Sequence, residues 1–330
     1  FRAFAFRAGS PSAADVVVGL VFLLMVLELT RRVVGSPMVI IAAVFLVYAL
    51  VGRSMPALVA HRGVTLSRLV DHMFLGTEGI LGIPVGASAT YIFIFVLFGA
   101  FLEATRAARF FLDLALALVG RAVGGPAKTS VISSALLGTI SGSSIANVVT
   151  DGVVTIPLMV RNGYRPFFAA AVEAAASTGG QIMPPVMGAA AFIMVEYTGI
   201  RYNQIALAAA IPAILYFVGV YFSVHLEARR AGMRGLAPGE VPAFWKLLRG
   251  QGYLLLPLAV MMYSLAIGNT PMRAGALSIA AALAVSFVRR ADRLGVSGIL
   301  QALKSGGTAM VPVALACAAA GVIAGVISIT

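Results

Sequence analysis

The sequence predicts an all-helical protein that crosses a membrane several times. Of its 330 residues, 60% are hydrophobic and only 11% are charged, whereas soluble domains carry about a quarter charged residues. The mean hydropathy of +0.99 points the same way. Apolar runs recur along the whole chain, and turn residues or basic residues separate them.

Seven apolar runs are candidates to cross the bilayer as helices. Several are shorter than the roughly 20 residues that a span needs, so flanking residues must contribute to them. A further crossing is expected from residues 164–197, where the apolar pattern is interrupted. The seven runs cover residues 14–30, 37–52, 83–103, 207–227, 251–268, 271–289 and 306–330.

The basic residues set the expected orientation in the membrane. The net charge of +12 comes from residues scattered between apolar runs and not from one basic stripe, which argues against nucleic-acid binding. Arg31–Arg32, Arg229–Arg230 and Arg289–Arg290 each end an apolar run, as cytoplasmic loop charges do. Loop 228–250 is the most basic and is expected in the cytoplasm. Alternate crossings then place loop 53–80 outside, where its arginines fit the charge rule poorly.

Two shorter segments are expected to be helices that do not cross. Residues 107–122 are amphipathic and bounded by Arg109 and Arg121, a pattern typical of a helix that lies in the membrane interface. Residues 291–305 show a weaker version of this pattern. This pattern predicts either a second helix that lies in the membrane interface or an ordinary cytoplasmic linker helix.

The single cysteine and the first residue of the chain limit which disulfides and which chain start are possible. The single cysteine, Cys317, excludes an intramolecular disulfide, and its apolar setting predicts a core residue. The chain begins at Phe1, without a Met or a signal-peptide pattern, so we expect a fragment of a longer protein.

Small, polar and proline residues interrupt two apolar segments in the middle of the chain. Residues 128–160 have a polar centre at Ser141–Ser144, which predicts a re-entrant hairpin that enters and leaves the membrane on one side. Residues 164–197 contain Gly179-Gly180-Gln181 and Pro184-Pro185, which predict a broken helix. Lipid cannot satisfy a broken backbone, and paired breaks are typical of the midplane binding site of a secondary transporter.

The second half of the predicted hairpin places three polar side chains on one helix face. Ser143, Asn147 and Asp151 fall at positions i, i+4 and i+8. Such oxygens suit a hard cation, and we predict Ser143 and Asn147 as sodium ligands. The helix ends at the tip would favour anionic groups of a substrate. Alternatively, small residues only allow close packing, which explains Gly138 and Gly142 but not Asn147 or Asp151.

The broken helix carries a carboxylate of its own. Glu173 and Ser177 lie one turn apart, ahead of the interruption. A carboxylate inside a membrane predicts a functional site. The alternative is a structural ion pair or a snorkelling side chain, because Glu173 lies only about two turns past Arg165.

At these residues the chain resembles the large membrane subunit of the tripartite ATP-independent periplasmic (TRAP) transporters, in the form that fuses the small and large membrane subunits. The resemblance covers most of the chain and is most specific between residues 124 and 194. The matching stretches are LELTRRVVGSPMVI (27–40), GASATYIFIFVLFGAFLE (86–103), GGPAKTSVISSALLGTISGSSIANVV (124–149), TIPLMVRNGYRPFFAAAVEAAASTGGQIMPPVMGAAAFIM (155–194) and ALAAAIPAILYF (206–217).

The resemblance implies an importer of the bacterial inner membrane that needs no cofactor. Its expected coupling ion is sodium, and a periplasmic solute-binding protein would deliver its substrate, a small organic anion. It implies an elevator-type transporter fold, in which hairpins and broken helices slide against a scaffold. By this match, the residues expected to contact the cation or the substrate are Ser141, Gly142, Ser143, Ser144, Asn147, Gly180, Gln181, Pro184 and Pro185.

The resemblance also implies a division of the chain. Residues 1–60 correspond to scaffold helices like those of the small subunit, and 61–227 to the first inverted repeat. Residues 228–330 correspond to a linker and the start of a second repeat, which is expected to be incomplete. Asp151 departs from the family pattern, where a small uncharged residue is usual. It adds a cation or proton site, or faces a cytoplasmic crevice.

Two alternatives to a transporter remain. An intramembrane serine hydrolase using Ser141 or Ser143 needs a base within reach. No histidine is expected in mid-helix, and Lys128 and Lys304 are expected in loops, so we do not expect an enzyme. A non-transporting membrane scaffold is the other alternative. Specific sodium binding would separate the transporter from both.

Overall fold

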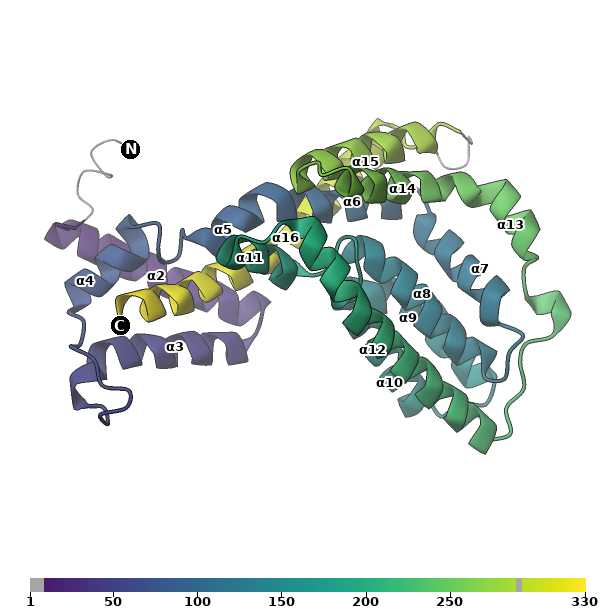
Figure 1. The fold of residues 1–330 in the computed structure, drawn as a ribbon, viewed down its shortest axis with the longest axis horizontal. Coiled ribbons are helices and arrows are strands. Elements are labelled where there is room, and N and C mark those ends of the chain that lie inside the picture. Colours follow the sequence, from purple (N-terminus) through teal and green to yellow (C-terminus); the bar gives the residue numbers. More distant parts are fainter. Residues whose placement is uncertain (1–8, 289–292) are drawn as a thin grey trace. The chain divides into compact units, whose positions relative to one another are not determined.

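The computed structural model describes residues 9–288 and 293–330, so Phe1 and the pair Arg289–Arg290 lie outside the described residues. Within the described residues, all regular structure is helical, as predicted (Figure 1). Six helical segments in this described part are long and apolar enough to cross a membrane, and the chain is a multi-pass membrane protein. They are α2 (Ala13–Val33), α3 with its final 3-10 turn (Ser36–Ser54), the segment from α5 to α6 (Ile83–Ala104), α9 (Ser144–Arg161), α12 (Tyr202–Arg230) and α16 (Val296–Ile329).

The first of two compact units consists of the residues up to Thr90 together with Thr308–Thr330. Helix α2 begins at a capping box, in which the side chains of Ser12 and Asp15 each accept from the other's backbone N–H group. The unit contains α2, α3 (Ser36–Val51), α4 (Leu66–Val70), η2 (Asp71–Leu75), α5 (Ile83–Ala87) and the last part of α16. Its core holds Leu23, Val26, Ala42, Ala49, Leu69, Met73, Ile80, Ala318, Val322 and Val326.

The second unit runs from Tyr91 to Gly307. Helices α8, α9, α10 and α12 pack against one another there (Figure 1). The unit contains α6 (Phe93–Ala104), α7 (Ala107–Val119), α8 (Gly125–Ser141), α9, α10 (Pro166–Gly179), α11 (Ala189–Thr198), α12, α13 (Phe244–Gln251), α14 (Leu256–Ala266), α15 (Pro271–Ser286) and the start of α16. Its core is rich in alanine, which lets helices approach closely, and includes Ala127, Val131, Ala135, Met159, Ala169, Val172, Ala176 and Phe217.

Helices α8 and α9 form a hairpin that turns at the predicted polar centre. Helix α8 starts after Gly124 and carries Pro126 in its first turn. Backbone N–H groups in the first turn have no partner within the helix, so proline loses no hydrogen bond there. It ends at Gly142, whose left-handed φ of 57° favours glycine. Ser143 then caps α9 by accepting from the Ala146 N–H at 3.3 Å. The re-entrant passage of this hairpin through a membrane stays a prediction.

Two predicted spans are shorter than expected. The run 251–268 yields α14, which has 11 residues, because Gly252–Leu255 forms a separate 3-10 turn. The run 271–289 yields α15, which has 16 residues and begins at the Thr270 cap. Neither reaches the roughly 20 residues of a straight crossing.

The predicted boundary between 291–305 and the last apolar run is wrong. From Val296 onward both segments form one continuous helix, α16. Gly306 looks like a helix stop in the sequence, but it serves close packing, since a Cβ there would lie 3.3 Å from the Leu97 Cα atom. Loop 53–80 also contains helical turns, namely the short helix α4 and the π-helical turn η2.

Candidate functional site

The predicted break separates α10 from α11. Helix α10 ends at Gly179, a single 3-10 turn covers Gly180–Ile182, and α11 begins at Ala189. The Pro184–Pro185 peptide bond between them is cis. Tyr202, the first residue of α12, donates its hydroxyl to the carbonyl oxygen of Pro185 at 2.6 Å. The break is therefore fixed by a side chain from a neighbouring helix.

The hairpin tip lies directly against this break. Gly138 and Gly180 meet backbone to backbone, since a Cβ on Gly180 would lie 2.9 Å from the Gly138 Cα atom. A Cβ on Gly142 would collide with the carbonyl oxygen of Met187. The Gln181 side chain donates from Nε2 to the Ser144 hydroxyl at 2.7 Å. The two interruptions lie in separate segments of the sequence, but in the structure they contact each other.

Asn147 lies immediately behind the tip and is 1% exposed. Its Nδ2 donates to the Ser134 carbonyl oxygen at 3.0 Å. Its Oδ1 is buried and has no hydrogen-bond partner. An unpaired buried amide oxygen is unfavourable, and it is a ligand that a hard cation accepts.

Glu173 is fully buried and surrounded by hydroxyl groups. Ser130 donates to its Oε2 at 2.8 Å, and Thr155 donates to the same oxygen. Ser177 donates to Oε1 at 3.0 Å, and Ser134 lies 3.4 Å from that oxygen. The snorkelling alternative for Glu173 is therefore wrong, because the carboxylate lies between α8, α9 and α10.

Asp151 completes this polar interior and is 2% exposed. It follows Asn147 by one turn of α9, and the Ser133 hydroxyl of α8 lies beside its carboxyl group. Its Oδ2 is buried without a hydrogen-bond partner. The opposite face of α9 carries the exposed side chains of Ile145 and Val149, so the polar residues face the inside of the unit.

Other predicted site residues are used in the local structure of the tip. The Ser141 hydroxyl accepts from the Ser143 N–H at 3.4 Å, and the Ser143 hydroxyl is the cap of α9. Pro184 is half-buried and Pro185 is buried in the break. The structure thus brings Gly142, Ser144, Gly180 and Gln181 together at the tip, with Asn147, Asp151 and Glu173 behind them.

Sequence reasoning missed the hydroxyl groups that surround Glu173. Ser130 and Ser134 lie four residues apart on α8, and Thr155 follows Asp151 by four residues on α9. This i, i+4 spacing was the available signal, but only the packing of three helices shows that the hydroxyls meet one carboxylate.

The expectation that Lys128 and Lys304 lie in loops is wrong. Lys128 is buried in the first turn of α8, and Lys304 lies within α16. The Lys128 ammonium lies 3.0 Å from Nδ1 of His225 on α12 and 4.7 Å from the centre of the Tyr221 ring. Helix α8 starts earlier than its apolar pattern suggests, because the left-handed turn at Gly124 ends the preceding loop.

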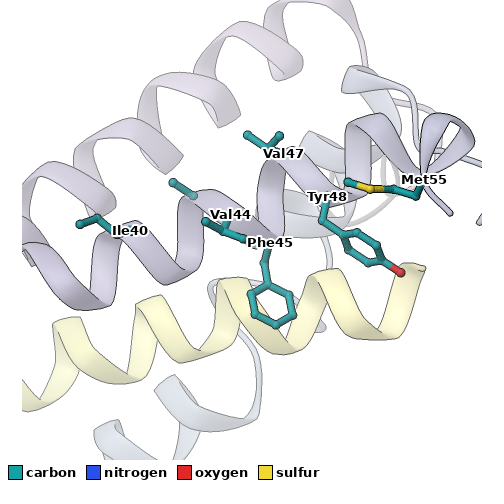
Figure 2. Close-up of a pocket in the computed structure, with 7 residues that line it drawn as sticks. Ile40, Val44, Phe45, Val47, Tyr48 and Met55 are labelled. Carbon is teal, nitrogen blue, oxygen red and sulfur yellow. The ribbon is translucent and has the colours of Figure 1, made fainter. Parts of the chain in front are cut away.

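A separate apolar groove runs along α3 in the first unit. Figure 2 shows Ile40, Val44, Phe45 and Tyr48 along it, with Met55 at its end. It holds no charged side chain and none of the predicted site residues. It is therefore not a candidate site for an anionic solute.

Comparison with known proteins agrees with the geometry. A profile of the family described as "Tripartite ATP-independent periplasmic transporter, DctM component" matches residues 21–330. The chain belongs to this family. The family is one of transporter permeases and not of enzymes, so the serine-hydrolase alternative is wrong.

Individual relatives carry the same family name. The chain is 29% identical over 212 residues to the C4-dicarboxylate TRAP transporter large permease protein DctM of Vibrio cholerae, covering 63% of this chain and 43% of that protein. It is 31% identical over 212 residues to the protein of the same name from Pseudomonas aeruginosa, covering 61% and 47%. It is 38% identical over 91 residues to the isethionate TRAP transporter permease protein DctMQ of Oleidesulfovibrio alaskensis, covering 28% and 14%. The chain spans about half the length of the DctM relatives it matches.

Proposed function

We propose that this chain is part of the permease of a sodium-coupled TRAP importer in the bacterial inner membrane. A periplasmic solute-binding protein hands over a small organic anion, and the cation gradient drives its uptake. The observation that carries the proposal is the unpaired, buried Asn147 amide oxygen behind a contact of two helix interruptions. A break in a helix and a free oxygen ligand side by side are what a transported cation needs.

The anionic substrate is proposed from two observations. The start of α9 sits at the contact, and the unpaired N–H groups of a helix start attract negative charge. The names of the Vibrio and Pseudomonas relatives refer to C4-dicarboxylates. We therefore place the carboxylate of the solute at Ser143, Ser144 and Gln181, on the open side of the contact.

The elevator mechanism follows from the same arrangement. The hairpin and the broken helix hold the site between them, so they would carry it across the membrane as one body. The buried hydroxyl–carboxylate bonds between α8, α9 and α10 favour such rigid movement.

Equilibrium binding of radioactive sodium to the purified full-length permease tests the proposal without knowledge of the solute. We expect saturable binding that unlabelled sodium displaces and potassium does not. Asn147→Ala should weaken it roughly tenfold or more, which corresponds to about 1.4 kcal/mol. Asn162→Ala is the matched control, because Asn162 follows α9 directly and its side chain donates from Nδ2 to the Leu158 carbonyl oxygen at 2.8 Å, away from the tip. Binding that survives Asn147→Ala unchanged would contradict this site.

A further inference from the structure

Two side-chain oxygens on the inner face of α9 lack a hydrogen-bond donor. They are Asn147 Oδ1 and Asp151 Oδ2, and both residues are at least 98% buried. One helical turn separates the residues, so their side chains are neighbours on one face. Buried acceptors are almost always paired, and two unpaired ones side by side indicate a bound species.

The side chains of Asn147 and Asp151 contact the same short stretch of α8. Asn147 donates from Nδ2 to the Ser134 carbonyl oxygen at 3.0 Å, and Ser133 lies beside the Asp151 carboxyl group. Consecutive residues of α8 thus meet consecutive turns of α9. The two side chains therefore lie between the two arms of the hairpin, Asn147 one turn and Asp151 two turns from its tip.

An ionised carboxylate at Asp151 would require a compensating positive charge. Glu173, on α10, already accepts from the hydroxyls of Ser130, Thr155 and Ser177. These hydroxyls satisfy its oxygens but bring no positive charge to the pair of carboxyl groups. Buried charges are paired or coordinate metals.

Charged side chains on α6, α7 and α8 have partners other than Asp151. On α8, Lys128 contacts His225 of α12 at the base of the hairpin. On α6, the Glu103 carboxylate accepts from Thr150 at 2.8 Å. On α7, Arg109 interacts with Asp113. None of these contacts supplies a cation to Asp151.

We propose that Asp151 is an anionic ligand of the coupling sodium ion, which it holds together with the amide oxygen of Asn147. A carboxylate and an amide oxygen are hard ligands of the type that sodium accepts. The identity of the ion as sodium rests on the proposed function. The ligand set differs from the pair Ser143 and Asn147 expected from the sequence, because the Ser143 hydroxyl is used as the cap of α9.

The sodium dependence of thermal unfolding of the full-length permease tests the ligand set. A ligand that binds only the folded state raises the unfolding temperature as its concentration passes the dissociation constant. The wild-type protein is titrated with sodium chloride, with potassium chloride keeping the ionic strength constant. The variants are Asp151→Asn, which keeps the shape but removes the charge, Ser143→Ala, and Asp113→Asn as a carboxylate control on α7.

We expect Asp151→Asn to shift the sodium midpoint roughly tenfold or more, because ligand charge is a main determinant of cation affinity. Asp113→Asn should keep the wild-type midpoint, because Asp113 lies on α7 and outside the hairpin. A wild-type midpoint in Asp151→Asn, with a shifted one in Ser143→Ala, would overturn the ligand set and leave sodium coupling intact. A wild-type protein that sodium does not stabilise would overturn the ligand set together with sodium coupling.

If Asp151→Asn does not fold, the radioactive sodium assay on Asp151→Glu decides. This variant keeps the charge but moves it by one methylene group. Sodium binding weaker than wild type supports the ligand set, and unchanged sodium affinity contradicts it.

Discussion

Single glycines determine whether the tip can meet the break. Gly180→Ala places a Cβ atom 2.9 Å from the Gly138 Cα atom, and backbone atoms cannot rotate away as a flexible side chain can. We expect a loss of stability of about 1–3 kcal/mol and weaker sodium binding, because the added Cβ would also lie 3.3 Å from Nδ2 of Asn147. Thermal unfolding and radioactive sodium binding measure the two effects.

Gly219→Ala is the matched control for this change. Gly219 lies within α12, and an added Cβ would meet nothing within 4 Å. Alanine is favoured over glycine in a helix by up to about 1 kcal/mol, so this variant should be neutral or stabilising. Equal destabilisation by both variants would show that the Gly138–Gly180 contact has no special role.

At the residue level, the sequence could predict what lies on one helix but not what lies across two. The i, i+4 spacing of Asn147 and Asp151 placed them on one face, and both are buried there. The four hydroxyl groups around Glu173 come from three helices, and serine and threonine are too common for their spacing to identify a partner. Burial of Glu173 also excludes the alternative in which its side chain snorkels to the membrane surface.

At the level of helices, the base of the hairpin is joined to α12 by Lys128 and His225. The 3.0 Å contact between Nζ and Nδ1 holds the start of α8 beside the last turns of α12. We expect Lys128→Met and His225→Phe to be non-additive, with a coupling free energy of about 0.5–3 kcal/mol in the double mutant. Denaturant unfolding in detergent measures it.

Lys246→Met combined with His225→Phe is the control for this cycle. Lys246 is exposed on α13 and far along the chain from α8, so these two changes should be additive. Additivity of Lys128→Met with His225→Phe as well would show that the contact does not join the two helices energetically.

The ends of helices were predictable from the sequence where the local residue types determine them. Gly142 and Ser143 end one helix and start the next, as a left-handed glycine followed by a capping serine does. The continuity of α16 through Gly306 was not predictable, because this glycine ends no helix and instead packs against Leu97. Glycine ends a helix at Gly142 but allows close packing within a helix at Gly306, and only the neighbouring helix distinguishes these two roles.

At the level of the whole molecule, composition was sufficient to predict a helical multi-pass membrane protein. The match of residues 21–330 places the chain in the DctM family of transporter permeases. The chain spans about half the length of the relatives it matches, so transport is a property to test in the full-length permease with its partner proteins.

Uptake into proteoliposomes tests the central claim most directly. The full-length permease is reconstituted, its solute-binding protein is added outside, and labelled C4-dicarboxylates are offered with an inward sodium gradient or with potassium in its place. We predict uptake that requires both the binding protein and the sodium gradient, and that Asn147→Ala abolishes while Asn162→Ala does not. Uptake that proceeds equally without a sodium gradient would contradict the account.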